Sequence, residues 1–338
     1  MNKVVRRISL TIALLSSVLF LASCGSKKDS AKTKDITVVL DWTPNTNHTG
    51  LYVAKEKGYF KKEHLNVKFV QPPKDGAEQV VASGKAQFGI SAQDTQADAI
   101  GRENSLPITS VGAILQHNTS GIMSRKADNI KSPKDMQGKR YATWNLPTEQ
   151  AIIKQVVKDD HGDYSKIKKI PNNITDEVAA LKAHQTDDLW IFYGWAGINA
   201  EVKKFPTNYF SFRSINDTFD YYTPTIISNT SYLKNNPDVA KRFMKATAKG
   251  YTYAAKNPRS SAKILLDSVS ELKSNEKLIY ASQNYLSKYY LTKSGQFGAI
   301  DEKRWNKFYS WLDDHKLVDQ KLAHNAGFTN QYLPKEDQ

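Results

Sequence analysis

The chain has 338 residues, a formal net charge of +14 at pH 7 and one cysteine. A single cysteine excludes an internal disulfide and a site built from several thiolates, so a hydrophobic core must supply the stability. A basic balance can indicate nucleic-acid binding, but these lysines are scattered along the chain rather than gathered in one block, and we expect no nucleic-acid partner. The length suffices for two domains at ~150 residues each.

The first residues follow the pattern of a bacterial signal peptide. Three basic residues precede a short apolar run, 8–21, which is too short to cross a bilayer comfortably. The run ends in Leu-Ala-Ser-Cys, which resembles the lipobox, whose cysteine is diacylated and becomes the mature N-terminus. We therefore predict a signal peptide over 1–23, lipidation of Cys24, a tether over 24–34, and anchoring at the extracytoplasmic face of the cell membrane. Export is a second argument against nucleic acid, and the positive charge suits a soluble surface near an anionic membrane and wall.

The rest of the chain alternates between strand-like and helix-like segments. Strands are predicted at 36–42, 67–72, 88–94 and 107–115, with helices at 48–58, 75–86 and 95–105 between them. The pattern restarts with strands at 120–126, 167–173, 187–195, 209–215 and 223–229, a short helix and a strand within 132–145, and helices at 147–160 and 176–184. After Pro237 the chain is predicted to be helical through Leu312. This alternation predicts parallel sheets covered by helices.

The restart of the pattern indicates an α/β protein with two lobes. We predict one lobe from 35–119 together with 223–338, and the other from 120–222. The extended segments 120–126 and 223–229 would cross between the lobes and form a hinge beside a cleft. Ligand sites in open α/β sheets lie at the carboxyl ends of the strands.

Aromatic and short polar side chains are concentrated at those predicted strand ends. The candidates for ligand binding are Asp41, Trp42, Asn45, Asn47, His48, Ser91, Gln93, Asp94, Trp144, Glu149, Tyr193, Trp195, Tyr222 and Thr223. Tryptophan and tyrosine faces stack on flat rings, while carboxylates, amides and hydroxyls pair with ring nitrogens and amines. The pattern therefore favours a flat heteroaromatic ligand. We predict no metal site, because His48 has no second histidine at metal-ligand spacing.

Several of these residues have structural alternatives. Asn45 and Asn47 are common turn and helix-cap residues, and Glu149 can equally be a capping carboxylate. Some other aromatic residues are predicted to pack in the core or on helix faces, namely Trp190, Trp305, Trp311, Tyr285, Tyr289 and Tyr290.

The segment Trp-Thr-Pro-Asn-Thr-Asn-His at 42–48, the Gly-Tyr-Phe that follows, and the later segments Gly-Ile-Ser-Ala-Gln-Asp, Thr-Trp-Asn-Leu-Pro-Thr-Glu and Tyr-Tyr-Thr-Pro resemble the binding proteins for thiamine pyrimidine precursors. The resemblance spans nearly the whole mature chain. It implies a periplasmic-binding-protein fold of type II and a receptor that delivers a 4-amino-2-methylpyrimidine to the permease and ATPase of an ABC importer. We expect no cofactor, and we expect a monomer because a lone anchored receptor is usually monomeric. The resemblance also adds Tyr59 to the site candidates.

The resemblance leaves other functions open. Fungal pyrimidine-precursor synthases share the fold, but they use a lysine that holds pyridoxal phosphate, a histidine that is consumed, and a cysteine-rich segment. The corresponding segments here, Gly-Ile-Ser-Ala-Gln-Asp-Thr-Gln and Phe-Asp-Tyr-Tyr-Thr-Pro, contain none of these residues, so we expect a receptor and not an enzyme. A receptor of the same fold for a sulfonate or another heteroaromatic stays possible, although arginines are sparse at the strand ends, with only Arg213 close to one. The residues do not rank hydroxymethylpyrimidine against formylaminomethylpyrimidine.

Overall fold

A computed structural model describes residues 32–335 of the protein; the predicted signal peptide, Cys24 and most of the predicted tether lie outside the described residues. The chain from Lys34 onward forms a compact unit. The strands are β1 (Lys34–Val39), β2 (Leu65–Val70), β3 (Phe88–Ser91), β4 (Ile108–Ala113), β5 (Ser120–Arg125), β6 (Arg140–Thr143), β7 (Lys168–Pro171), β8 (Asp188–Phe192), β9 (Thr207–Ser211) and β10 (Thr225–Asn229).

The α-helices lie between and after these strands. They are α2 (Thr49–Glu56), α3 (Tyr59–Lys62), α4 (Gly76–Ala82), α5 (Gln93–Ile100), α6 (Pro147–Asp159), α7 (Glu177–Lys182), α8 (Ile198–Val202), α9 (Phe212–Ile215), α10 (Thr230–Asn235), α11 (Pro237–Lys256), α12 (Pro258–Ser268), α13 (Glu276–Leu286) and α14 (Glu302–Asp314). Three shorter turns matter for the site: the 3₁₀ turns η1 (Thr46–His48) and η6 (Asp217–Phe219), and the π-helical turn η5 (Tyr193–Gly197).

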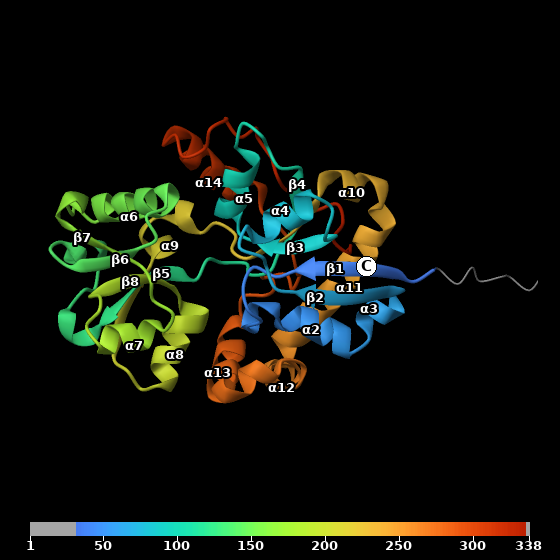
Figure 1. Cartoon of the computed structure of the whole chain (residues 1–338), viewed down its shortest axis with the longest axis horizontal. Helices are drawn as coiled ribbons and strands as arrows, with labels where there is room; N and C mark the ends of the chain where they lie inside the picture. Colours follow the sequence, from blue (N-terminus) through green and yellow to red (C-terminus); the bar gives the residue numbers. More distant parts are fainter. Residues whose placement is uncertain (1–31, 336–338) are drawn as a thin grey trace, which may run out of the picture. The chain divides into compact units, whose positions relative to one another are not determined.

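The strands form two five-stranded sheets (Figure 1). The first has the order β2-β1-β3-β10-β4 and the second β7-β6-β8-β5-β9. Four of the neighbouring pairs are parallel, namely β1 with β2 and β3, and β6 with β7 and β8. The other four are antiparallel, because β10 runs against β3 and β4, and β5 runs against β8 and β9. The prediction of wholly parallel sheets is therefore wrong by one strand in each sheet. These two strands are the ones by which the chain enters one sheet from the other, so they run back against their neighbours.

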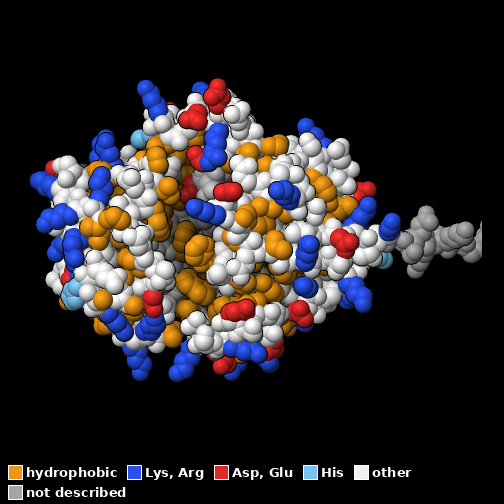
Figure 2. Space-filling model, viewed as in Figure 1, with side chains coloured by type: hydrophobic (Ala, Val, Ile, Leu, Met, Phe, Trp, Pro, Cys, Tyr) orange, Lys and Arg blue, Asp and Glu red, His pale blue; other side chains and the backbone are white. Residues whose placement is uncertain are grey.

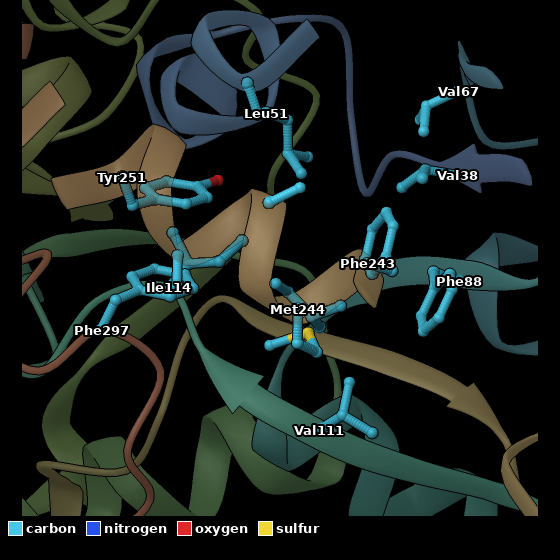
Figure 3. Close-up of a cluster of buried hydrophobic side chains, with 14 of the residues drawn as sticks. Val38, Leu51, Val67, Phe88, Val111, Ile114, Phe243, Met244, Tyr251 and Phe297 are labelled. Atoms are coloured by element: carbon cyan, nitrogen blue, oxygen red, sulfur yellow. The ribbon is translucent and has the colours of Figure 1, made fainter. Parts of the chain in front are cut away.

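Both faces of the first sheet are buried, and the alternation of side chains along β1 explains how. Val38 faces α2 and α11 in a cluster with Leu51, Phe88 and Phe243 (Figure 3), whereas Val39 faces α4 on the other side. Helices α2 and α11 approach each other at glycines. A Cβ on Gly50 would lie 2.2 Å from the ring of Tyr251, and one on Gly250 would lie 2.1 Å from the Gly50 carbonyl oxygen. This close crossing fixes α2, whose first turn lies beside the candidate site.

The second sheet is covered in the same way. Helix α6 packs on one face through Ile152, Ile153 and Val156, which contact Tyr141 and Trp190. Helices α7 and α8 cover the opposite face, around Leu189 and Ile191 (Figure 1). The predicted strand 209–215 is shorter than expected, because β9 ends at Ser211 and residues from Phe212 form α9.

Strand register shows that the carboxyl edges of the two sheets face the same crossing segments. In the first sheet Thr225, the first residue of β10, pairs with Ser91, the last residue of β3. In the second, Ser120 begins β5 and pairs with Phe192, the last residue of β8. The chain therefore enters each sheet at its carboxyl edge, which is where ligand sites of α/β sheets form.

Two helices from the C-terminal part of the chain, α13 and α14, contact the turns η5 and η6. Ser282 in α13 donates a hydrogen bond to the carbonyl oxygen of Gly194 in η5, and Lys307 in α14 forms an ion pair with Asp217 in η6. Over residues 32–335, no helix has the length and apolar character needed to span a membrane.

Candidate functional site

The turn after β1 holds one carboxylate in a fixed position. The backbone N–H of Asn45 donates to Nδ1 of buried His48 (3.1 Å), so Nδ1 carries no proton and Nε2–H donates to Oδ1 of Asp41 (2.7 Å). Asn45 caps η1 by accepting from the N–H of Asn47 (2.9 Å). The Asp41 side chain remains 33% exposed, and its second oxygen forms no hydrogen bond within residues 32–335. His48 thus orients Asp41 from within the core, and Asp41 offers a free acceptor.

Large hydrophobic side chains are exposed at the carboxyl ends of strands in both sheets. Trp42 follows β1 and is 69% exposed; Trp144 (46%) and Leu146 (56%) follow β6, and Phe192 (44%) ends β8. Figure 2 shows a hollow between the second sheet, on the left, and the first sheet, with hydrophobic side chains along its walls. Exposed apolar groups gathered in this way are typical of a ligand site. Leu146 and Phe192 are not among the residues predicted from the sequence, although both adjoin polar or aromatic residues at predicted strand ends.

Glu149 supports the loop that carries Trp144. One carboxylate oxygen accepts from the Tyr141 hydroxyl (2.6 Å) and the Trp144 N–H (3.3 Å). The other accepts from the Thr143 hydroxyl (2.9 Å) and the Leu146 N–H (3.3 Å). Burial, followed by the charge of Glu149, raises the pKa of Tyr141 well above its usual value, so its hydroxyl remains a donor. Glu149 is buried and engaged on both oxygens, which corresponds to the capping alternative.

The polar residues after β3 are largely engaged within the protein. Ser91 donates to Glu78. Gln93 is buried, donates from Nε2 to the Trp305 carbonyl oxygen (2.9 Å) and accepts from the Tyr222 N–H (3.0 Å). This leaves neither end of the Gln93 amide free for a ligand.

Asp94 differs from these neighbours because one of its oxygens is buried without a partner. Oδ2 accepts from the Tyr221 hydroxyl (3.2 Å), whereas buried Oδ1 has no hydrogen bond among the described residues. Burial raises the pKa of Asp94, and hydrogen bonds from the Thr95 backbone and Tyr221 offset this only in part. Thr223, two residues after Tyr221, is buried, and no hydrogen bond of its hydroxyl group is found in the described part of the chain.

Tyr193 and Trp195, which lie in η5 directly after β8, contact the C-terminal helices. The Tyr193 ring lies 5.4 Å from that of Tyr285, and its hydroxyl donates to Glu201. Trp195 packs against the cluster formed by α12, α13 and Tyr52. A Cβ on Gly194 would lie 2.5 Å from Cδ2 of Leu286, so any larger residue there would displace the Leu286 side chain. The geometry gives these two aromatic residues packing roles.

Tyr59 and Tyr222 also occupy structural positions. Tyr59 follows α2, which extends about 12 Å away from the η1 turn at 1.5 Å per residue, and its ring carries the Lys249 ammonium at 5.5 Å. Tyr222 is buried, accepts from the Asp301 N–H (2.8 Å) and lies under the Arg304 guanidinium at 3.9 Å. The predictions that Trp190 and Trp305 are core residues are confirmed.

An ionic cluster ties the two crossing segments together. Asp220 accepts from Nδ1–H of His117 (2.7 Å), from the N–H of Asn118 (2.8 Å) and from Arg304 of α14 (3.0 Å). Arg304 also donates to the carbonyl oxygen of Gln116 (2.7 Å). Burial raises the pKa of Asp220, but the His117 hydrogen bond and the Arg304 charge outweigh it and hold the pKa below its usual value. Helix α14 thus braces the two crossing segments, a role that the sequence did not indicate.

The arrangement offers aromatic stacking surfaces on two facing edges and a carboxylate beside one of them. Within residues 32–335, no three His, Cys, Asp or Glu side chains lie together as a metal site. Of the predicted site residues, Asp41, Trp42 and Trp144 are free to contact a ligand, as is Asn47, whose side-chain amide forms no hydrogen bond in the described chain.

Comparisons with known proteins agree with this geometry. Residues 45–261 match the family model described as NMT1/THI5 like, and the chain belongs to this family. The chain is 29% identical to the formylaminopyrimidine-binding protein of Halalkalibacterium halodurans, over 94% of this chain and 97% of that protein. It is 22% identical to the 4-amino-5-hydroxymethyl-2-methylpyrimidine phosphate synthase of Legionella pneumophila, over 88% and 92% of the two chains.

Solved structures share the fold at low sequence identity. The periplasmic aliphatic sulphonate binding protein SsuA of Escherichia coli has a TM-score of 0.67 and 12% identity, covering 91% of this chain and 96% of that one. The protein therefore has the two-lobed α/β fold of periplasmic binding proteins, as predicted.

Proposed function

We propose that this member of the NMT1/THI5 like family is a receptor that captures a pyrimidine precursor of thiamine and delivers it to an ABC importer. The observation that carries the proposal is the set of exposed aromatic side chains on two facing carboxyl edges, Trp42 on one and Trp144 with Phe192 on the other. The name of the Halalkalibacterium relative supports the ligand class, since that protein is a formylaminopyrimidine-binding protein. Hydroxymethylpyrimidine and formylaminomethylpyrimidine are both candidate ligands.

The chemistry of an aminopyrimidine fits the free groups of the site. Its flat ring stacks on tryptophan, and its exocyclic amine donates to a carboxylate. Asp41 supplies that carboxylate, because His48 occupies only one of its oxygens. The ring nitrogen beside the amine needs a donor, which the side-chain amide of Asn47 can supply.

Capture proceeds by closure of the lobes predicted at 35–119 with 223–338 and at 120–222. Each lobe contributes one stacking surface, so the ligand contacts both only when they close, and its binding energy shifts the population toward the closed state. The permease and ATPase of the importer would then distinguish the closed receptor from the open one. We further propose that the receptor is a monomer, anchored through Cys24 outside the cell membrane.

Two other functions, a sulfonate receptor and a synthase, fit the site residues less well. A sulfonate receptor needs a free cation in the cleft, yet Arg304 is engaged at the hinge and Arg213 lies over the Tyr289 ring at 5.7 Å. A synthase that works like the fungal enzymes needs the lysine and histidine that residues 89–96 do not contain. Ser91, which lies in that segment, is engaged with Glu78.

A fluorescence titration tests the proposed ligand class. The chain that begins after Cys24 is titrated with hydroxymethylpyrimidine, formylaminomethylpyrimidine, thiamine and taurine, and tryptophan emission is followed. We expect saturable quenching with one of the two pyrimidines and no response to taurine. A response to taurine alone would contradict the proposal and favour the sulfonate receptor.

A further inference from the structure

The positive charge of the protein is concentrated on one surface, although the lysines are scattered along the sequence. Residues 32–335 contain 43 Lys and Arg against 31 Asp and Glu, a net charge of +12. Segments 49–70 and 237–256, which form α2, α3, β2 and α11, together contain ten Lys and Arg residues against three Asp and Glu residues, a net charge of +7. Residues 120–222 contain 15 against 13. More than half of the net charge thus lies on two segments that the fold brings together.

Helix α11 presents its cations along one stripe. Lys241, Lys245 and Lys249 are spaced by four residues, which places them on the same side of the helix, and all three are exposed. Lys61 and Lys62 of neighbouring α3 are exposed as well. We call these five lysines together with Arg242 the basic surface.

Side-chain contacts show that α3 and α11 form this surface jointly. Arg242 donates to the carbonyl oxygen of Glu63, directly after α3 (2.6 Å), and Lys245 pairs with the Glu63 carboxylate (2.6 Å). The Lys249 ammonium lies over the ring of Tyr59, the first residue of α3. Glu63 neutralises one of the six cations, so the basic surface keeps a strong positive charge.

The chain enters the fold beside the basic surface. The N–H of Lys34 donates to the carbonyl oxygen of His64 (3.0 Å), and Lys34 pairs with Leu65 at the start of β2. His64 follows α3 by two residues. Figure 1 accordingly shows α3 near the beginning of β1. Lys34 lies ten positions after Cys24, a distance of at most ~35 Å along a fully extended chain. A lipid on Cys24 would therefore keep this surface close to the membrane.

We propose that the basic surface binds the anionic phospholipid headgroups of the membrane to which Cys24 is anchored, an inference that rests on the predicted anchor. Lysines near an anionic bilayer each contribute about 1 kcal/mol, or roughly a fivefold gain in partitioning, within a Debye length of ~8 Å at physiological salt. The surface and the tether thus act as two membrane signals, and they orient the undocked receptor. A merely solvated lysine face would show neither this clustering nor the adjacent chain entry.

Vesicle sedimentation tests the proposal without the lipid anchor. The chain that begins after Cys24 retains the whole compact unit. It is mixed with vesicles of phosphatidylcholine, either pure or containing ~30% phosphatidylglycerol, at physiological salt. We expect binding to the anionic vesicles only, with release at high salt. Equal binding to both vesicles, or binding to neither, overturns the proposal.

A charge-matched pair of variants locates the binding surface. The first replaces Lys61, Lys62, Lys241 and Lys249 with Gln, and the second replaces the exposed Lys126, Lys154, Lys158 and Lys168 of the second lobe with Gln. Because each lysine contributes about a fivefold gain in partitioning, we expect the first variant to bind the anionic vesicles several hundred times more weakly than the wild type. The vesicle binding of the second variant should stay within about threefold of the wild type. Equal losses in both variants would mean that net charge alone drives binding and would overturn the proposal. Pyrimidine titration of both variants separates this result from a failure of the proposed receptor function.

Discussion

Replacing Trp42 with Ala should abolish most of the affinity for the pyrimidine while leaving the fold intact. The side chain is 69% exposed, so its removal should change the free energy of unfolding by no more than about 0.5 kcal/mol. Stacking of a nucleobase on an aromatic side chain is worth about 1–3 kcal/mol, which corresponds to a 5- to 150-fold rise in Kd. Trp42→Phe keeps an aromatic face and should lose less.

Calorimetric titration with hydroxymethylpyrimidine and formylaminomethylpyrimidine measures this effect, and scanning calorimetry measures Tm in the same samples. Tyr253→Ala serves as the control. Tyr253 is half-buried on α11 beneath Lys57, on the side of the fold that carries α2 and α3, and its removal should leave Kd unchanged. A folded Trp42→Ala variant with the wild-type Kd would refute the stacking argument.

Three further variants test the supporting structure. Glu149→Ala leaves four donors unpaired and should lower the free energy of unfolding by about 2–4 kcal/mol in urea titrations, with weaker pyrimidine binding; an unchanged midpoint contradicts its capping role. Arg304→Gln removes a charge that keeps the pKa of Asp220 low, so the wild type should be more stable by about 1–3 kcal/mol at neutral pH, with the advantage shrinking as the pH falls through the acidic range; a pH-independent difference argues against this coupling. Asp188 is buried, and neither of its carboxylate oxygens has a hydrogen-bond partner among the described residues. Burial, followed by the charge of Asp187, raises the pKa of Asp188 well above its usual value. In the window from the usual pKa of an aspartate up to this raised pKa, each pH unit therefore lowers the free energy of unfolding by about 1.4 kcal/mol. The stability of Asp188→Asn relative to the wild type should therefore increase with pH over that window in thermal unfolding, and a flat difference would be evidence against a neutral Asp188.

The sequence predicted the elements of the fold better than their directions. The β-branched run around Val38 and Val39 and the helical spacing of Ile152, Ile153 and Val156 are local signals, and the structure has a strand and a helix there. The antiparallel direction of β5 and β10 is not a local property. It follows from where the chain returns between the sheets, which no short window of residues encodes.

The predicted site residues fall into two groups: some have their side chains engaged by other groups of the protein, and others remain exposed. Glu149 and Gln93 have the side chains expected of ligand contacts, yet their partners Tyr141 and Trp305 engage them within the protein. Trp42 has no such partner within residues 32–335 and remains exposed. A sequence reveals that a polar or aromatic residue follows a strand, but it does not reveal whether the protein or a ligand completes its contacts. The same holds for the basic surface, which forms only when α3 and α11 pack together.

A crystal structure of the chain with hydroxymethylpyrimidine or formylaminomethylpyrimidine bound would show whether the aromatic edges hold the ligand. We expect density for one flat ring between Trp42 and the edge that carries Trp144 and Phe192, with the exocyclic amine within hydrogen-bond distance of Asp41. Density for the ring elsewhere, such as the 630 Å³ cavity lined by Gln79, Lys85 and Arg102, would contradict it.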